Sequence, residues 1–233
     1  MKNLKQIKAV IFDLDGTLLD SLKDIAGAVN MGLAEMELPT HEIETYKSYV
    51  GHGHRELVKR ALPEDKRDEA HIKILCDKFM EHYETEWQIN TQPFHGILHL
   101  IKVAVSNKIK LAILSNKDQS FTKKMIRYYF RGAMISHTKN PFGVYSGAID
   151  GKAVKPDPTV ALELAQRLSA APENIAIVGD MPVDMITAKN AGMIAIGAAW
   201  GFASKEMLQT AGADMIFDSP VELATFLESQ SCF

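Results

Sequence analysis

Five short apolar runs, rich in β-branched residues, most strongly constrain what this chain can fold into. They cover residues 9–12, 111–114, 175–178, 194–198 and 215–217. Polar residues follow the first two runs directly and the third after one glycine. Such short, wholly apolar runs are typical of strands buried on both faces of a parallel sheet. Segments of helical periodicity lie between them, including residues 158–169 and 181–191. This alternation predicts an α/β fold built on a doubly wound (Rossmann-like) parallel sheet.

The stretch between the first two runs departs from this pattern. Residues 20–92 contain no convincing strand but several amphipathic runs, at 25–35, 42–49, 54–62 and 68–87. This is far more chain than a simple crossover connection needs. We therefore expect a helical domain inserted after the first strand. Residues 1–19 and 93–233 would form the α/β core, and residues 20–92 would form the insertion.

The composition excludes several classes of protein. Of the 233 residues, 46% are hydrophobic and 24% are charged, which is a globular balance and excludes a disordered or fibrous chain. A formal net charge of −3 offers no basic footprint for nucleic acid or an anionic membrane. The two cysteines, Cys76 and Cys232, match no metal or redox spacing, as expected in a reducing compartment. The N-terminus lacks a signal-peptide pattern and no apolar run is long enough to span a bilayer, so we expect a cytoplasmic protein.

Charged and polar side chains follow three of the predicted strands. In an open parallel sheet, ligands bind in the crevice at the carboxyl ends of the strands. The residues expected to meet there are Asp13, Asp15, Ser115, Lys155, Asp180 and Asp184. Two like charges 4 Å apart repel each other by roughly 4 kcal/mol at an effective dielectric of 20. A hard cation with oxygen ligands relieves that repulsion, so we expect Mg²⁺ at this site.

Four motifs, in a fixed order along the chain, carry a family resemblance. They are Asp13-Leu14-Asp15-Gly16-Thr17, Leu114-Ser115-Asn116, Lys155-Pro156-Asp157-Pro158 and Gly179-Asp180-Met181-Pro182-Val183-Asp184. Together they resemble the motifs of the haloacid dehalogenase-like hydrolases. The insertion between the first two motifs is similar to that of the family's phosphatases with helical caps. Within the family the chain looks most like the phosphoglycolate phosphatases, which implies 2-phosphoglycolate as the substrate.

The resemblance implies catalytic roles for four residues. Asp13 would attack phosphorus and form an aspartyl-phosphate, which splits one difficult hydrolysis into two easier steps. Asp15 would first give a proton to the leaving oxygen and then take one from the attacking water. Ser115 would hydrogen-bond a phosphoryl oxygen, and Lys155 would neutralise the charge that develops on the phosphoryl group.

The resemblance also implies the ligands of the Mg²⁺ ion. A side-chain oxygen of Asp13, the main-chain carbonyl of Asp15 and the carboxylate of Asp180 would bind it. Asp184 would complete or orient that shell. Met181 departs from the family pattern, which usually has Ser or Thr after the Gly-Asp pair. Because Asp180 and Asp184 are both present, we expect this departure to alter the metal shell without abolishing activity.

The candidates for substrate binding are Thr17, Asn116, Lys117, Gly51, His52 and Arg55. In the family, a Thr at position 17 is typical of phosphatases. Thr17 could equally serve as a polar loop residue. Lys117 would face either a substrate carboxylate or solvent. In the loop that precedes Arg55, glycines permit close approach and the guanidinium can pair with a substrate anion. The same residues, Gly51, His52 and Arg55, could also be ordinary exposed loop residues with no ligand.

The sequence therefore predicts a phosphoric monoester hydrolase that acts on a small phosphorylated metabolite, with no nucleic-acid or membrane partner. A sugar-phosphate mutase stays open, because it would use the same aspartyl-phosphate and differ only in the acceptor. A phospho-accepting signalling domain also places acids, Ser or Thr and Lys at strand ends, but it needs neither the insertion nor Asp15. A binding module on an inactive scaffold is disfavoured because every chemical position is filled. Monomer and homodimer are both compatible with the sequence.

Overall fold

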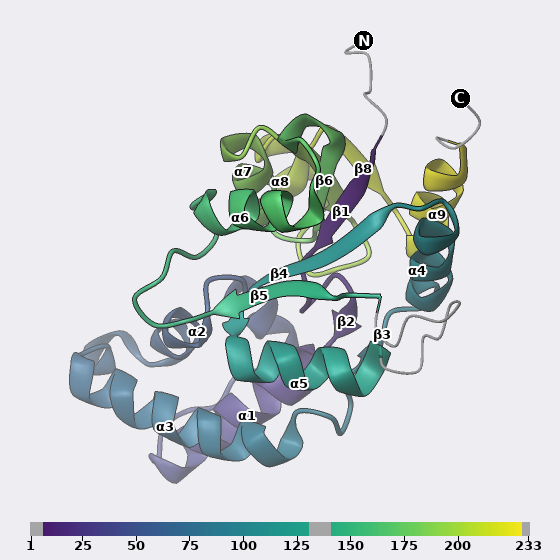
Figure 1. The fold of residues 1–233 in the computed structure, drawn as a ribbon. Helices are drawn as coiled ribbons and strands as arrows, with labels where there is room; N and C mark the ends of the chain where they lie inside the picture. The colour runs from purple at the N-terminus through teal and green to yellow at the C-terminus, as the bar shows by residue number, and fades with distance from the viewer. Residues whose placement is uncertain (1–6, 131–140, 230–233) are drawn as a thin grey trace. The chain divides into compact units, whose positions relative to one another are not determined.

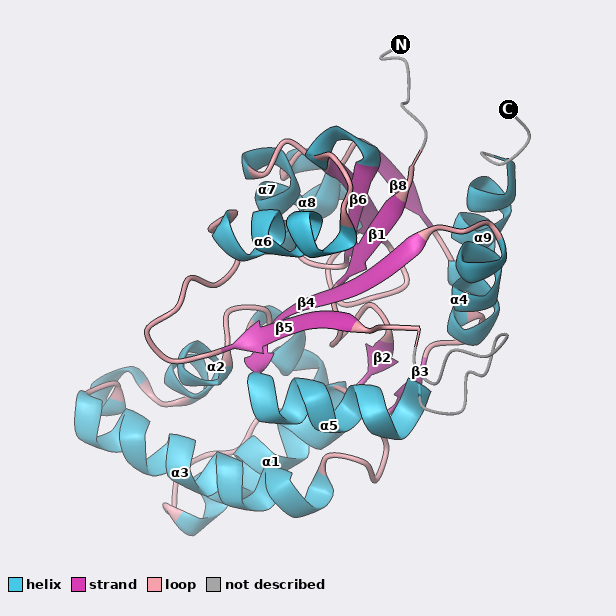
Figure 2. Cartoon of the chain, in the orientation of Figure 1, coloured by secondary structure: helices cyan, strands magenta, loops and turns pink. Residues whose placement is uncertain are grey.

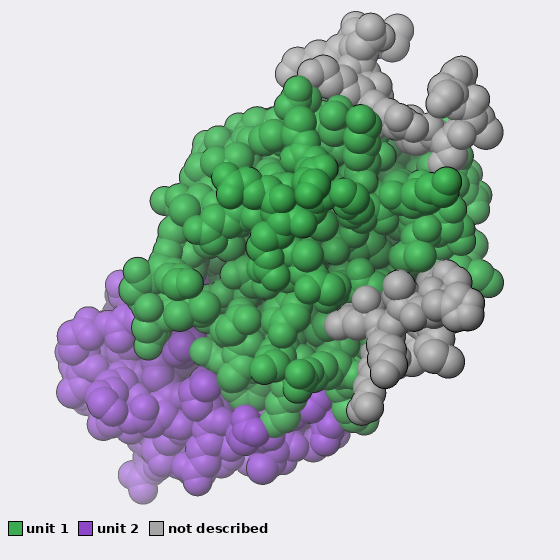
Figure 3. Space-filling model, viewed as in Figure 1, with its two compact units in different colours: residues 1–18, 93–233 green, residues 19–92 purple. Residues whose placement is uncertain are grey.

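The computed structural model describes residues 7–130 and 141–229. Two parts of the chain used in the sequence analysis lie outside these ranges. They are Cys232, considered for the reducing compartment, and residues 1–6, considered for a signal peptide. The chain divides into two compact units, coloured separately in Figure 3. Met1–Leu18 and Pro93–Phe233 form the first, here termed the sheet unit, and Leu19–Gln92 form the second, termed the helical unit.

The sheet unit is built on six parallel strands in the order β5-β4-β1-β6-β7-β8. The strands are β1 (Ala9–Phe12), β4 (Lys110–Asp118), β5 (Val144–Ala148), β6 (Ile175–Gly179), β7 (Ile194–Ala198) and β8 (Met215–Phe217). The predicted α/β fold and its five strands are thus confirmed. The edge strand β5 was not predicted, because most of its side chains are half-exposed and form no apolar run.

Helices cover both faces of this sheet (Figures 1 and 2). They are α4 (Ile97–Ser106), α5 (Gln119–Phe130), α6 (Thr159–Leu168), the 3₁₀ turn η3 (Pro172–Asn174), α7 (Pro182–Asn190), α8 (Lys205–Thr210) and α9 (Pro220–Ser229). Helices α6, α7 and α8 lie together on one face, and α4 packs against α9 on the other. Successive strand residues point to opposite faces. On the face covered by α6 and α7, Ile11 of β1 packs in one cluster with Leu164 of α6 and Met185 of α7. All three side chains are buried.

The helical unit contains three α-helices and two 3₁₀ turns. They are α1 (Leu22–Glu35), η1 (Ile43–Ser48), α2 (His54–Ala61), η2 (Glu64–Lys66) and α3 (Glu69–Glu86). Helix α3 packs against α1 and α2 over the buried side chains of Leu33, Leu75 and Phe79. Two short strands that were not predicted, β2 (Leu19–Asp20) and β3 (Gln92–Pro93), pair where the unit begins and ends.

A buried carboxylate ties the two ends of the helical unit together. Asp24, in the first turn of α1, is 4% exposed. It accepts hydrogen bonds from the main-chain N–H and side-chain amide of Asn90, at 2.9 and 2.8 Å. It also accepts from the main-chain N–H and hydroxyl of Thr91, at 2.8 and 2.7 Å. One side chain therefore satisfies donors that lie 66 and 67 positions further along the chain.

Replacing Asp24 with Ala should lower the free energy of unfolding by about 3 kcal/mol, because the N–H groups of Asn90 and Thr91 would lose their charged acceptor. Urea unfolding followed by circular dichroism measures this change. Asp77→Ala is the matched control, since Asp77 is 66% exposed and its pair with Lys73 contributes less than about 1 kcal/mol. Equal losses in the two variants would contradict the structural role of Asp24.

Candidate active site

Three buried carboxylates meet at the carboxyl ends of two central strands. Asp13 follows β1, and its main-chain N–H donates to the carbonyl of Val178 in β6 at 2.9 Å, so the parallel pairing continues to this residue. Asp180 follows β6, and Asp184 lies in the first turn of α7. One oxygen from each of the three carboxylates lies within 4.8 Å of the other two. The parallel register therefore concentrates negative charge at one edge of the sheet.

Lys155 is the cation that faces this cluster. Its Nζ lies 2.8 Å from Oδ1 of Asp13 and 2.6 Å from Oδ1 of Asp184, and the residue is only 4% exposed. Burial disfavours the charged ammonium, but the carboxylates of Asp13 and Asp184 outweigh that effect and raise the pKa of Lys155. Three ionised carboxylates against this single ammonium leave an excess of two negative charges.

Burial makes that excess costly. It raises the pKa of Asp13 to about 7, although Lys155 acts in the opposite direction and Asp184 adds to the rise. The pKa of Asp180 also lies well above its ordinary value, first because of burial and then because of the charges of Asp13 and Asp184. These carboxyl groups are therefore much easier to ionise when a further positive charge is supplied.

The cluster has the chemistry of a site for a hard cation. All three side chains offer carboxylate oxygens, the donors that Mg²⁺, Ca²⁺ and Mn²⁺ prefer. Oδ1 of Asp13 is buried and, besides its ion pair with Lys155, accepts no hydrogen bond from the described residues. Asp13, Asp180 and Asp184 can thus hold a divalent ion. The predicted contribution of the Asp15 carbonyl stays a prediction.

Asp180 is held by groups from two other loops. The hydroxyl of Thr17, which is fully buried, donates to Oδ1 at 2.8 Å, and the main-chain N–H of Phe202 donates to Oδ2 at 3.0 Å. The indole Nε1–H of Trp200 in turn donates to the carbonyl of Thr17 at 2.9 Å. Thr17, predicted to bind substrate, thus orients one of the three carboxylates in this structure.

Two glycines allow this close approach. Gly16 has φ of 84°, and a Cβ there would lie 2.2 Å from Oδ2 of Asp180. A Cβ at Gly201 would lie 2.2 Å from the Cβ of Asp180 and 2.3 Å from the carbonyl oxygen of Gly16. Any side chain at either position would displace Asp180. The sequence analysis missed the role of Gly201 and of the Phe202 N–H; their position just after the predicted strand 194–198 was the available signal.

Asp15 pairs with Lys117 across the same edge. The Nζ of Lys117 lies 3.2 and 3.0 Å from the two carboxylate oxygens of Asp15, and their side chains are 9% and 17% exposed. At 9% exposure the Lys117 side chain does not face solvent, and its contact with a substrate carboxylate stays a prediction. The ammonium instead orients the residue predicted to act as acid and base.

Ser115 and Asn116 lie on β4, which extends beyond the predicted end at residue 114. The Oγ of Ser115 accepts a hydrogen bond from the main-chain N–H of Lys117 at 3.2 Å. The side-chain amide of Asn116 donates to the carbonyl of Lys155 at 3.0 Å and accepts from its N–H at 2.9 Å. Asn116, predicted to bind substrate, thereby fixes the main chain that carries the buried ammonium.

Comparison with known proteins decides the family. Residues 10–198 match the model of the haloacid dehalogenase-like hydrolases. The chain is a haloacid dehalogenase-like hydrolase. A phosphoglycolate phosphatase from Aquifex aeolicus is 30% identical over 223 residues, which covers 96% of this chain and 98% of the relative. Another from Chromobacterium violaceum is 30% identical over 230 residues, covering 97% and 99%.

Solved structures agree with this assignment. A protein described as a candidate phosphoglycolate phosphatase from Lactobacillus delbrueckii subsp. bulgaricus aligns with a TM-score of 0.87 at 28% sequence identity. The alignment covers 96% of the hydrolase and 99% of that chain. Within the described residues, no helix is both long and apolar enough to cross a bilayer.

Met181 leaves the contact next to it intact. Oδ2 of Asp184 accepts its hydrogen bond from the main-chain N–H of residue 181, at 3.1 Å, and every residue except proline supplies that donor. The Met181 side chain packs into the buried cluster between the sheet and helices α6 and α7. The departure from the family pattern therefore removes a hydroxyl without removing the main-chain bond to Asp184.

The other three predicted substrate-binding residues belong to the helical unit. Gly51 has φ of 100°, a conformation that side chains disfavour. His52 is exposed, and the guanidinium of Arg55 donates to the carboxylate of Glu69 within the same unit. Their contact with substrate stays a prediction.

Substituting Asn116 with Ala should lower kcat of the hydrolase roughly 10- to 100-fold with little change in KM, because Lys155 would lose the bonds that place its ammonium. Steady-state kinetics measure both constants. Asn190→Ala is the control, since the side chain of Asn190 is exposed and donates one hydrogen bond within the described part of the chain, to the carbonyl of Pro156. A matching loss of kcat in both variants would contradict a positioning role for Asn116.

A divalent cation should stabilise the hydrolase more at about pH 8 than at about pH 5.5. Below the raised pKa values of Asp13 and Asp180, protons compete with the cation for the same oxygens. Without the cation, the free energy of unfolding should fall as pH rises from about 4 to about 7, because the folded protein binds these protons more tightly than the unfolded chain does. Thermal unfolding with EDTA or Mg²⁺ measures both effects.

The expected stabilisation is about 2.7 kcal/mol when the cation is at 100 times its dissociation constant. Asp180→Asn serves as the control, since it removes a ligand and should abolish most of the effect. An identical stabilisation at both pH values would show that the cation binds elsewhere.

Proposed function

We propose that the hydrolase is a Mg²⁺-dependent phosphatase that hydrolyses a small phosphate monoester, with 2-phosphoglycolate as the preferred substrate. The observation that carries this proposal is the buried carboxylate of Asp13, which lies against Lys155 and beside Asp180 and Asp184. The relatives named phosphoglycolate phosphatase, which match over nearly the whole chain, support the choice of substrate.

Asp13 is the proposed nucleophile. One of its carboxylate oxygens forms a bond to phosphorus while the bond from phosphorus to the ester oxygen breaks, which yields an aspartyl-phosphate. Lys155, 2.8 Å from Oδ1, orients the carboxylate and stays close enough to offset charge on the transferring group. Two simpler displacements thereby replace one very slow hydrolysis.

Asp15 is the proposed acid and base. Its proton passes to the leaving ester oxygen in the first step, and it then takes a proton from the water that attacks the phosphorus of the aspartyl-phosphate. That attack releases inorganic phosphate and restores the Asp13 carboxylate. The contact with Lys117, at 3.0 Å, orients Asp15 for both transfers.

Ser115 is proposed to bind a phosphoryl oxygen. Its Oγ accepts from the N–H of Lys117, which directs the hydroxyl proton toward another acceptor. The residue lies on β4, the strand directly beside β1, and it is 4% exposed. Its short side chain therefore suits it to hold a group bound at Asp13.

The proposed Mg²⁺ ion would be held by Asp13 and Asp180, with Asp184 completing or orienting the shell. When bound, it supplies positive charge that offsets the repulsion between the carboxylates and a phosphate dianion. The protein contributes the fixed geometry: Thr17 and the Phe202 N–H hold Asp180, and the Met181 N–H holds Asp184. The excess of negative charge noted above favours the binding of such a cation.

The helical unit is proposed to act as a cap. Residues 20–92 would cover the reacting groups, exclude bulk water and supply contacts to the leaving group through Gly51, His52 and Arg55. A phosphatase admits water in its second step, whereas a sugar-phosphate mutase must exclude it to protect the phosphorylated aspartate. The products of the reaction distinguish these two activities.

The test is phosphate release from a panel of esters, with Mg²⁺ and with EDTA. The panel holds 2-phosphoglycolate, hexose phosphates, nucleoside monophosphates and p-nitrophenyl phosphate. We expect turnover only with the metal and the highest kcat/KM for 2-phosphoglycolate. A hexose phosphate or nucleotide preferred by orders of magnitude would overturn the substrate, and an isomerised sugar phosphate would indicate a mutase.

Two isosteric variants test the chemistry. Asp13→Asn should lower kcat by roughly 10³-fold or more, because the nucleophile is lost. With p-nitrophenyl phosphate, whose leaving group needs no proton, Asp15→Asn should release about one equivalent of p-nitrophenol per enzyme and then stall. Rapid-mixing absorbance measures that burst. A linear time course for Asp15→Asn, at the wild-type rate, would rule out its role as base in the second step.

A further inference from the structure

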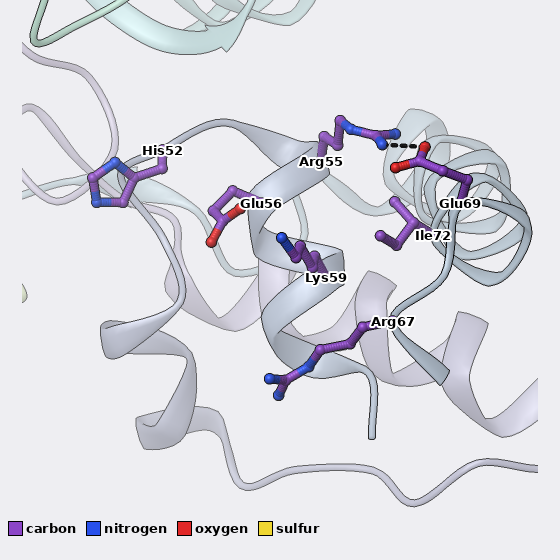
Figure 4. A pocket seen from close by; sticks show the side chains of 7 residues that line it. All are labelled: His52, Arg55, Glu56, Lys59, Arg67, Glu69 and Ile72. Carbon is purple, nitrogen blue, oxygen red and sulfur yellow. Dashed lines mark hydrogen bonds and ion pairs between the residues drawn. The ribbon is translucent and has the colours of Figure 1, made fainter. Parts of the chain in front are cut away.

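A pocket of about 230 Å³ lies between residues of the helical unit alone (Figure 4). Its charged lining residues are Arg55, Glu56, Lys59, Arg67 and Glu69. They come from helix α2, the segment that follows it and the start of α3. Figure 4 shows Lys59 between Arg55 and Arg67. Cations thus outnumber carboxylates in this pocket, in a chain whose formal net charge is −3.

Both carboxylates of the pocket already have cationic partners. Glu56 accepts a hydrogen bond from Nε of Arg60 at 2.9 Å, and Glu69 accepts one from Arg55. The bond from Arg60, followed by the nearby charges of Arg60 and Lys59, holds the pKa of Glu56 below its ordinary value. Glu56 therefore stays ionised in its pair with Arg60 at neutral pH.

The charge of Arg67 is fixed in place but not neutralised. Its Nε donates to the carbonyl of Leu62 at 3.0 Å, and its Nη2 donates to the carbonyl of Arg60 at 3.3 Å. Both acceptors are uncharged main-chain groups, so the guanidinium is oriented while its positive charge is kept. Preorganised cations of this kind bind anions with less loss of side-chain freedom.

Lys59 provides a second positive charge in the pocket. It is exposed on α2 and forms no ion pair with any of the described residues. Lys59 lies in the last turn of α2, and Arg67 donates to main-chain carbonyls at that same end of the helix. The pocket therefore combines an oriented guanidinium with an ammonium that shares the carboxylate of Glu56 with Arg60.

We propose that this pocket binds a small oxyanion, a phosphate or carboxylate group, through Lys59 and Arg67. Its volume is below the roughly 300 Å³ at which pockets begin to enclose a whole drug-sized ligand, so it suits a single anionic group. That group is either a free anion or the non-reacting end of a larger phosphorylated substrate. Binding at the pocket itself does not depend on the function proposed above.

The probe is inorganic phosphate, added to the ¹⁵N-labelled full chain without divalent metal and followed by amide chemical shifts. Saturable shifts are expected at Arg55, Lys59 and Arg67, with chloride at equal ionic strength giving none. Lys59→Met should weaken this binding roughly fivefold, the scale of about 1 kcal/mol for an exposed charged contact. Arg67→Gln should weaken it in the same direction.

Lys23→Met is the matched control, because Lys23 is an exposed lysine on α1 that does not line the pocket. The same affinity in the Lys59 and Lys23 variants, or shifts that never saturate, would overturn the proposal. If the full chain binds phosphate at the pocket but hydrolyses no ester, the pocket stands and the proposed function fails.

Kinetics separate the two sources of the oxyanion. If it is the substrate's own carboxylate, Lys59→Met should raise the KM for 2-phosphoglycolate relative to that for p-nitrophenyl phosphate, which has no carboxylate. If it is a free anion, the ratio of the two KM values should stay at its wild-type value. Either result is compatible with the pocket, provided that the amide shifts locate phosphate there.

Discussion

The repulsion among three buried carboxylates is the constraint on which the rest of the sheet unit depends. Asp13, Asp180 and Asp184 share one edge of the sheet, and the buried ammonium of Lys155 contacts two of them. Charges that close are tolerated in a low-dielectric site only when hydrogen bonds and counter-ions compensate them. The surrounding loops supply that compensation, through main-chain donors and through positions where no side chain intrudes.

Strand β4 shows how one extended segment can serve several groups at once. The hydroxyl of Ser115 points its lone pair at a neighbouring N–H, the amide of Asn116 pairs with the main chain of Lys155, and the ammonium of Lys117 pairs with Asp15. Consecutive residues in an extended chain point in different directions, which makes this division of contacts geometrically simple. The strand therefore fixes both the main chain at Lys155 and the side chain of Asp15.

Much of this arrangement could be predicted from sequence because it follows from strand order. Apolar runs identified the four inner strands and the edge strand β8, and the residues that follow β1 and β6 identified two of the buried acids. The edge strand β5 escaped because Val144–Ala148 is half-exposed and has no run of apolar residues. The partners of Asn116 and Lys117 could not be predicted, since both contacts join residues far apart in the chain, 39 and 102 positions respectively.

The bonds made by Asp24 have a consequence for how such a protein can diversify. The hydrogen bonds of Asp24 and the pairing of β2 with β3 keep the two ends of residues 19–92 side by side. The rest of that segment is therefore an excursion, an inserted loop of chain that leaves and returns at the same place. Insertions, deletions or wholesale exchange inside the excursion leave the spacing of its two ends unchanged. The excursion can therefore change over evolutionary time while the strands that carry the three buried carboxylates keep their register.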